Sequence, residues 1–287
     1  QWHGKAPKPE LVPIIEQELE SQFMIAPSII AGDMSNLEKE VKRCEDGRAD
    51  YIHLDVMDGQ FVPNKTFDHT KIKDLRPLTL IPFDTHLMIN EPIKHIHEYM
   101  DAGSDIVTVH AEVCDESSFG EICDVLQSNQ IGVGLAINPD TELPQWSYKF
   151  VPLLDQVIIM SVVPGKSGQK FIESTHEKIQ RISKDLKQHN FEGYIEADGG
   201  VNLENIGSCF EDGARAFVGG SAIIGQSDVR LIIKEFRNNI LESRRRSLIK
   251  KAHEIGGKEL VNSWIDLHIV GKKKDNLVKI AKEFGFQ

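Results

Sequence analysis

Short apolar, β-branched segments alternate with longer amphipathic segments from residue 23 to about residue 241. This alternation predicts parallel strands connected by helices, because a strand buried on both faces reads as a continuous apolar run and a surface helix carries an apolar stripe. Helical periodicity is clearest at residues 37–45, 93–100 and 172–186. Eight strands are predicted, at residues 23–30, 51–57, 82–89, 106–112, 132–137, 157–162, 194–198 and 216–219. Eight such strands close a (β/α)₈ TIM barrel, an α/β fold of about 250 residues.

The chain of 287 residues leaves room for an extension on each side of the barrel. We predict an N-terminal extension at residues 1–22 with a short helix at 10–20, the barrel at residues 23–242, and a C-terminal extension at residues 243–287. The C-terminal extension is basic, with 11 Lys and Arg against 5 Asp and Glu. We interpret it as a helical appendage that packs its apolar side chains on the barrel or on another subunit. A nucleic-acid-binding arm is the weaker alternative, because basic runs this short are common.

Composition and charge narrow the class of protein. A net charge of −11 argues against general binding of nucleic acid or of anionic membranes, because those surfaces repel an acidic protein. No apolar run approaches the roughly 20 residues of a membrane span, and the N-terminus shows no apolar signal-peptide segment. The four cysteines are scattered and form no CxxC pair. We therefore expect a reduced, cytoplasmic protein.

Two histidines and two aspartates stand at the ends of predicted strands. His53 and Asp55 are two residues apart on one strand, so their side chains point to the same face. His86 ends another strand and Asp198 a later one, and strand ends meet at the carboxyl rim of a barrel. Such a mixed set of nitrogen and oxygen ligands suits Zn²⁺, Fe²⁺, Mn²⁺ or Co²⁺ better than Ca²⁺ or Mg²⁺. Each residue alone is more often structural, but their joint placement predicts a metal site.

Three glycine-rich turns indicate phosphate binding. Each follows a predicted strand, at residues 163–169, 198–201 and 218–221, so that backbone N–H groups face an anion there. The turns after the last two strands are the usual phosphate location in a TIM barrel. One glycine-rich turn would be weak support, because most glycines only permit a tight turn. Three in this order favour a phosphorylated substrate.

At these positions the chain resembles the ribulose-phosphate 3-epimerase family. The resemblance covers about residues 23–241 and rests on the segments at 26–30, 53–64, 86–88, 108–112, 164–171, 198–201 and 220–223. It implies that His53, Asp55, His86 and Asp198 bind the metal and that Asp55 and Asp198 are the catalytic acid and base. It also implies that Met57, Met88 and Met160 cap the site. The substrate-binding residues that we infer are Ser28, His86, Gly165, Lys166, Ser167, Gly168, Asp198, Gly199, Gly200, Gly220 and Ser221. His110 and Glu112 are interpreted as orienting residues outside the ligand set.

The resemblance implies an isomerase of carbohydrate metabolism, in the pentose phosphate pathway, that converts D-ribulose 5-phosphate to D-xylulose 5-phosphate and back through an enediolate. Inverting the carbon beside a ketone requires proton removal on one face and proton return on the other, which two carboxylates can perform. The expected cofactor is a divalent metal ion, Zn²⁺ or Fe²⁺ before Mn²⁺ or Co²⁺, and the expected assembly is a homo-oligomer. The alternatives are an epimerase for another ketose phosphate, such as allulose 6-phosphate, and a non-catalytic phosphosugar-binding scaffold.

One segment distinguishes the chain from related barrel families, and another departs from the pattern of the epimerase family itself. The Asp-x-Lys-x-x-Asp pattern of related decarboxylases and aldol-type synthases is absent, because the segment at residues 53–58 has no lysine. The turn at residues 163–168 departs from the family, which usually has Asn or Glu at the place of Val163 and Phe-Gly at the place of Lys166 and Ser167. Backbone N–H groups still serve the phosphate there, and Lys166 either adds a charge or points to water.

Overall fold

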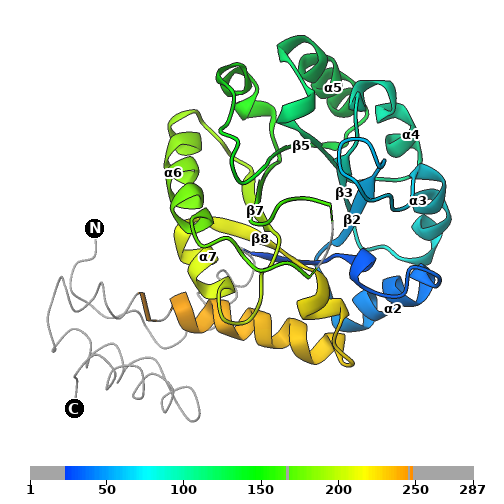
Figure 1. Ribbon diagram of the computed structural model, residues 1–287, viewed down its shortest axis with the longest axis vertical. Helices are drawn as coiled ribbons and strands as arrows, with labels where there is room; N and C mark the ends of the chain where they lie inside the picture. The colour runs from blue at the N-terminus through cyan, green and yellow to red at the C-terminus, as the bar shows by residue number, and fades with distance from the viewer. Residues whose placement is uncertain (1–22, 166–167, 245, 248–287) are drawn as a thin grey trace, which may run out of the picture. The chain divides into compact units, whose positions relative to one another are not determined.

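Strands and helices alternate through the part of the chain that the structure describes (Figure 1). The computed structural model describes residues 23–165, 168–244 and 246–247. The strands are β1 (Met24–Pro27), β2 (Ile52–Met57), β3 (Phe83–Met88), β4 (Ile106–His110), β5 (Gly132–Ile137), β6 (Gln156–Met160), β7 (Tyr194–Asp198) and β8 (Ala214–Gly219). The helices are α2 (Leu37–Gly47), α3 (His69–Leu75), α4 (Ile96–Asp101), α5 (Glu116–Ser128), α6 (Thr175–Gln188) and α7 (Ile206–Asp212), and residues 229–244 are also helical.

The strands form one parallel sheet that closes on itself. Its order is β1-β8-β7-β6-β5-β4-β3-β2, and every strand pair is parallel. A bridge between Ser28 and His53 joins the two outer strands of that order. Figure 1 shows the resulting ring of strands with the helices outside it. The predicted (β/α)₈ TIM barrel is therefore confirmed.

The division of the chain into segments is only partly described. Residues 24–236 form one compact unit. The helix predicted at residues 10–20 and the apolar residues predicted to pack from the tail lie outside the described residues, so the proposed boundaries of the extensions stay predictions. No helix in the described part of the chain is long and apolar enough to cross a membrane.

Several elements end where local geometry changes at the rim of the barrel. The first predicted strand stops at Pro27 and the fourth at His110, because 3₁₀ turns at Ile29–Ala31 and Ala111–Val113 follow. The helix predicted at residues 93–100 is divided into a 3₁₀ turn at Pro92–Lys94 and α4. The first two of these turns carry the chain out of the sheet just after Ser28, which lines the cavity, and His110, which contacts His86.

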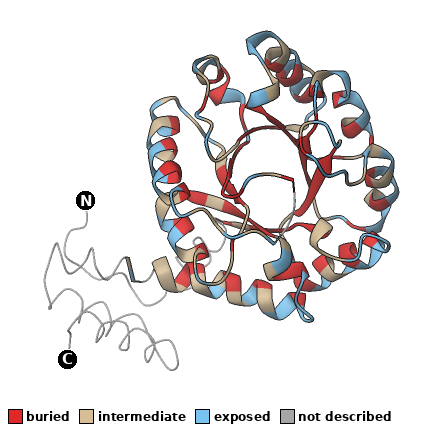
Figure 2. Cartoon of the chain, viewed as in Figure 1, coloured by how far each residue is buried: buried red, intermediate tan, exposed pale blue. Residues whose placement is uncertain are grey.

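The strands are buried on both faces, as Figure 2 shows. All six residues of β2 are buried, and the same is true of β3. Because alternate strand residues point to opposite faces, Ile52, Leu54 and Val56 share one face of β2. His53 and Asp55 share the other face, with Met57 beyond them. This alternation places polar chemistry inside a barrel whose outer strand faces are apolar.

The helices begin and pack as their sequences dictate. The Asn36 side chain accepts the Lys39 N–H at the start of α2, and Asp115 and Ser118 form a capping box at the start of α5. In α6 the side chains of Ile179, Ile182 and Leu186 are buried, which is the i, i+3, i+7 stripe of a helix on a sheet. The helical layer thereby holds the strand ends in place.

Gly134 on β5 provides a test of how tightly the barrel interior is packed. A Cβ there would lie 1.9 Å from Thr108 Oγ1. We predict that Gly134→Ala lowers the free energy of unfolding by about 1–3 kcal/mol through overpacking, measured by urea denaturation. The control is Gly120→Ala in α5, where the new Cβ would make ordinary contact at 3.5 Å with Phe150. That variant should be as stable as the parent protein or more stable, by about 0.5–1 kcal/mol. Equal urea midpoints for the two variants would contradict this packing.

Candidate active site

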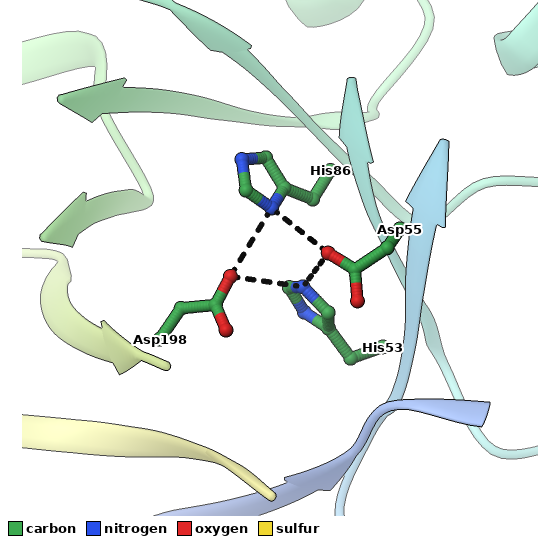
Figure 3. A group of neighbouring side chains, drawn as sticks. All are labelled: His53, Asp55, His86 and Asp198. Atoms are coloured by element: carbon green, nitrogen blue, oxygen red, sulfur yellow. Dashed lines mark hydrogen bonds and ion pairs between the residues drawn. The ribbon is translucent and has the colours of Figure 1, made fainter. Parts of the chain in front are cut away.

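Four side chains meet at the carboxyl ends of three strands. His53 and Asp55 come from β2, His86 from β3 and Asp198 from the end of β7. Figure 3 shows them as a ring in which each imidazole lies between the two carboxylates. His53 Nε2 lies 3.2 Å from Asp55 Oδ1 and 3.6 Å from Asp198 Oδ2. His86 Nδ1 lies 3.2 Å and 3.3 Å from the same two oxygens. The structure thus brings together the four residues that the sequence nominated as ligands.

The spacing of this ring fits a divalent cation. Ligand atoms placed tetrahedrally around Zn²⁺ at about 2.0–2.2 Å are about 3.3–3.6 Å from one another. The four nitrogen–oxygen distances, 3.2–3.6 Å, agree with that spacing, and all the ligand atoms lie within 4.8 Å of one another. Two neutral imidazoles and two carboxylates would also neutralise a charge of +2. The donor set therefore suits a borderline metal ion such as zinc or iron.

The imidazoles and the carboxylates of the ring shift one another's pKa values. Burial lowers the pKa of His53, but Asp55 and Asp84 outweigh it and raise that pKa well above its usual value. Burial also lowers the pKa of His86, but hydrogen bonds to Asp198 and Asp55 outweigh burial and raise that pKa above its usual value. Burial raises the pKa of Asp55, and the two imidazoles reverse this and hold it far below the usual range. The pKa of Asp198 is lowered in the same way against burial and against Asp55.

His53 is held from behind by side chains inside the barrel. Its Nδ1 lies 2.6 Å from Asp84 Oδ2, and Gln156 Nε2 donates to Asp84 Oδ1 at 2.8 Å. When His53 Nδ1 donates to Asp84, the lone pair of His53 Nε2 is directed at the ring. The sequence analysis assigned Asp84 and Gln156 no role. For Asp84 a signal was present, because it stands two residues before His86 on one strand, whereas Gln156 lies just before the strand predicted at residues 157–162.

Asp84, Glu196 and His53 also form a second group of potential metal ligands. The short distance from His53 Nδ1 to Asp84 Oδ2 is that of a hydrogen bond and leaves no space for an ion between these atoms. Glu196 Oε1 is farther away, 3.5 Å from the same nitrogen. Burial, with Asp84 next, raises the pKa of Glu196 well above its usual value, which favours the uncharged acid. We therefore assign this group to the support of His53.

His86 has its own supporting side chains on the other side of the ring. Its Nε2 lies 2.8 Å from His110 Nε2, and His110 Nδ1 lies 3.0 Å from Glu112 Oε2. The ring of Phe61 packs over His110 at 4.7 Å between centroids. Burial is the main cause of the lowered pKa of His110, which keeps that imidazole neutral. His110 and Glu112 thus lie outside the ring of four ligands, in agreement with their interpretation as orienting residues.

A cavity opens beside the ring. Ser28, Asp55 and Asp198 line one part of it, with Met57, Met88 and Met160 alongside. The glycine turns line the rest, through Gly165, Gly168, Gly199, Gly200, Gly220 and Ser221. Lys166 and Ser167 lie outside the described residues. His86 joins the ligand ring but not the cavity wall. One cavity therefore combines the acidic ring with backbone suited to an anion.

The turns around this cavity need glycine for backbone reasons. Gly199 and Gly200 have positive φ angles of 117° and 66°, which residues with a Cβ rarely adopt. A Cβ on Gly200 would also lie 2.4 Å from the backbone nitrogen of Phe171. The amide of Asn64 donates to the carbonyl of Gly165 at 2.5 Å and so ties the turn after β6 to the loop after β2. In the sequence, Asn64 is the last residue of the segment at 53–64 that carries the family resemblance.

Ser28 contacts the ring itself as well as the cavity. Its hydroxyl donates to Asp55 Oδ2 at 2.5 Å, on the oxygen that does not face the histidines. Asp55 is thus held through both of its oxygens. Ser28 is only 3% exposed, so it can reach a bound molecule only from within the cavity.

The fold and this site define a (β/α)₈-barrel enzyme with a candidate metal centre in a cavity lined by glycine turns. Residues 24–224 match the ribulose-phosphate 3 epimerase family. Over 216 residues the chain is 40% identical to the ribulose-phosphate 3-epimerase of Bacillus subtilis, covering 75% of this chain and 98% of that one. It is 38% identical to the chloroplastic ribulose-5-phosphate-3-epimerase of Arabidopsis thaliana, with 77% and 78% covered. The chain belongs to the ribulose-phosphate 3-epimerase family and is an enzyme of the isomerase class.

Solved structures resemble the chain in fold alone. The 3-hexulose-6-phosphate synthase from Salmonella typhimurium superposes with a TM-score of 0.56 at 14% identity, covering 77% of this chain and 99% of that one. The 3-keto-L-gulonate-6-phosphate decarboxylase from Vibrio cholerae gives 0.55 at 14%, with 76% and 97% covered. At such identity the barrel is shared and the chemistry is not implied.

The charge balance of the ring predicts proton release on metal binding. The raised pKa values of His53 and His86 strengthen proton binding at the nitrogen atoms that a cation would use. We therefore expect Zn²⁺ to bind more weakly at about pH 6 than at about pH 8, since protons compete better at the lower pH. Calorimetry in buffers of different ionisation enthalpy should give a positive number of protons released. Binding that is independent of pH and of buffer would contradict this electrostatic description.

Proposed function

We propose that this enzyme interconverts D-ribulose 5-phosphate and D-xylulose 5-phosphate with Asp55 and Asp198 as its acid/base pair. The observation that carries the proposal is the placement of these two carboxylates on one cavity, from β2 and β7, with the imidazoles between them. Membership of the family supports an epimerase reaction. The specific substrates and the roles of the two aspartates are our own inference.

The reaction that we infer is a proton transfer across the plane of an enediolate. One aspartate removes the proton from the third carbon of the ketose, and the other returns a proton to the opposite face. An aspartate with a reference pKa of about 4 is a weak base for a carbon acid, and each unit of mismatch costs about 1.4 kcal/mol. In the reverse reaction the two aspartates exchange roles.

His53, Asp55, His86 and Asp198 would hold the divalent metal ion, for which we favour Zn²⁺ or Fe²⁺ over Mn²⁺ and Co²⁺. Bound there, the ion supplies positive charge that stabilises the negative charge of the enediolate. Asp84 fixes the ring of His53, and Ser28 holds the second oxygen of Asp55. These contacts limit the rotation of the ligands and so preserve the spacing of the ring.

The rest of the cavity supports a phosphorylated sugar. Met57, Met88 and Met160 are 4%, 1% and 3% exposed, and their thioethers neither donate nor exchange protons. We infer that they exclude water from the reactive part of the substrate. The glycine turns present backbone rather than side chains, and we infer that their N–H groups hold the phosphate. A cytoplasmic location and self-association stay predictions.

The substrate assignment is tested by turnover on purified protein. We expect interconversion of ribulose 5-phosphate and xylulose 5-phosphate, loss of activity with a chelator, and recovery on adding Zn²⁺ or Fe²⁺. Allulose 6-phosphate provides the comparison, because it differs in chain length and not in the epimerised centre. Higher kcat/KM on the hexulose phosphate would transfer the assignment to that substrate. Absence of turnover on both would overturn the proposal.

The acid/base assignment is tested separately with Asp198→Asn and Asp55→Asn. Loss of one proton-transfer group should lower kcat by about 10²–10⁴-fold. The matched control is Asp46→Asn on α2, whose side chain is 67% exposed and which should retain full activity. Each aspartate variant, loaded with metal, should also lose incorporation of solvent deuterium at the third carbon from one epimer. Full activity of either active-site variant would contradict the two-carboxylate mechanism.

A further inference from the structure

We propose that Glu112 is a positioning residue that, acting through His110, keeps the proton of His86 on Nε2 and leaves Nδ1 to the cation. The inference rests on the proposed metal centre. Glu112 touches none of the four ring atoms, and its side chain is 19% exposed at the edge of the barrel. Its influence therefore has to pass through the pair of imidazoles that stack between it and the ring at 5.0 Å between centroids.

The chain of contacts is continuous. Glu112 Oε2 lies 3.0 Å from His110 Nδ1, and His110 Nε2 lies 2.8 Å from His86 Nε2. His86 Nδ1 then faces Asp55 Oδ1 at 3.2 Å and Asp198 Oδ2 at 3.3 Å. Both imidazoles are fully buried, so water cannot replace any of these partners.

The direction of each hydrogen bond follows from the first one. An ionised carboxylate only accepts, so His110 Nδ1 carries the proton and donates to Glu112. A neutral imidazole then has a bare Nε2, which accepts from His86 Nε2–H. With its proton on Nε2, His86 offers the lone pair of Nδ1 to a cation in the ring. One carboxylate thereby selects the tautomer of a ligand two side chains away.

The orientation of Glu112 is itself fixed. Its other oxygen, Oε1, accepts the backbone N–H of Asn138 at 2.7 Å. The loop that carries this N–H is held by Lys178, which is only 6% exposed and whose Nζ donates to the carbonyls of Asn138 at 2.7 Å and Thr141 at 2.6 Å. Glu112 Oε1 is therefore occupied by a backbone donor, and Oε2 is the oxygen that faces His110.

The two ligand histidines are oriented by different means. His53 meets Asp84 directly and turns Nε2 to the ring. His86 turns Nδ1 to the ring, and its other nitrogen, Nε2, is connected to the carboxylate of Glu112 only through the imidazole of His110. Only the arrangement at His86 includes a hydrogen bond between two histidines. One proton lies between His86 Nε2 and His110 Nε2, so one nitrogen donates and the other accepts. That single proton makes the arrangement reversible by a substitution at its far end.

The substitution Glu112→Gln should reverse the whole chain. The new amide must keep its oxygen toward the Asn138 N–H, so its NH₂ group faces His110 Nδ1 and can only donate. His110 Nδ1 then accepts, His110 Nε2 donates, and His86 Nε2 accepts. A neutral His86 then keeps its proton on Nδ1, and a cation can displace that proton only by breaking the hydrogen bond between the two imidazoles. Glu112→Ala removes contacts without imposing either direction, so it should disturb the metal site less.

The experiment measures metal binding and protonation on the full-length chain. Metal-stripped protein is titrated with CoCl₂ alone, followed by calorimetry and by the visible absorption of the bound ion. We expect Kd for Co²⁺ to rise about 100-fold in Glu112→Gln and about 10-fold or less in Glu112→Ala. Nitrogen-15 NMR of histidine-labelled, metal-free protein should show the His110 proton on Nδ1 in the parent protein and on Nε2 in Glu112→Gln.

The control is Glu142→Gln, which makes the same change of charge at an exposed residue paired with Arg181. It should bind Co²⁺ as the parent protein does. Thermal unfolding of all variants identifies any that fail to fold, and for those the NMR comparison is made at lower temperature. A parent protein that binds no Co²⁺ would refute the metal centre of the proposed function. Unchanged tautomers, or a larger loss in Glu112→Ala than in Glu112→Gln, would overturn the role of Glu112 alone.

Discussion

Two aspartates face one another across a buried ring, and the surrounding side chains offset the electrostatic cost of holding two carboxylates there. Two carboxylates this close repel each other, and burial adds to the cost of charging them. His53 and His86 lie between them and hold Asp55 ionised against both effects. A divalent cation in the same place would also offset this repulsion and would supply the positive charge that stabilises an enediolate. The balance of charge thus links stability, metal affinity and catalysis.

The barrel provides this balance through strand geometry rather than through a specialised loop. Alternate residues of β2 point inward, so that the ligands His53 and Asp55 come from a single strand. β3 and β7 each contribute one further ligand at the same level, and the parallel register keeps all the carboxyl ends at one rim. Behind the ring, Asp84 and His110 occupy the interior where an ordinary barrel has aliphatic layers. These two interior side chains orient the ligands His53 and His86.

Much of this could be predicted from the sequence, because the responsible signals are local. The strand runs, the spacing of His53 and Asp55, and the glycine turns are all visible in short windows. The partners that orient the ligands were not visible in this way. Gln156 is 72 residues from Asp84 and 48 from Thr108, and it contacts both only because the barrel closes. The same is true of Asn64, which reaches Gly165 across 101 residues, and no pattern of neighbouring residues announces such a contact.

The central claim is that one cation occupies the ring formed by His53, Asp55, His86 and Asp198. Diffraction from crystals of the full-length protein grown with Zn²⁺, measured on both sides of the zinc absorption edge, tests it most directly. We expect one anomalous peak at about 2.0–2.2 Å from His53 Nε2, from His86 Nδ1 and from one oxygen of each aspartate. A peak elsewhere, or one that leaves either aspartate turned away from the ion, would contradict it.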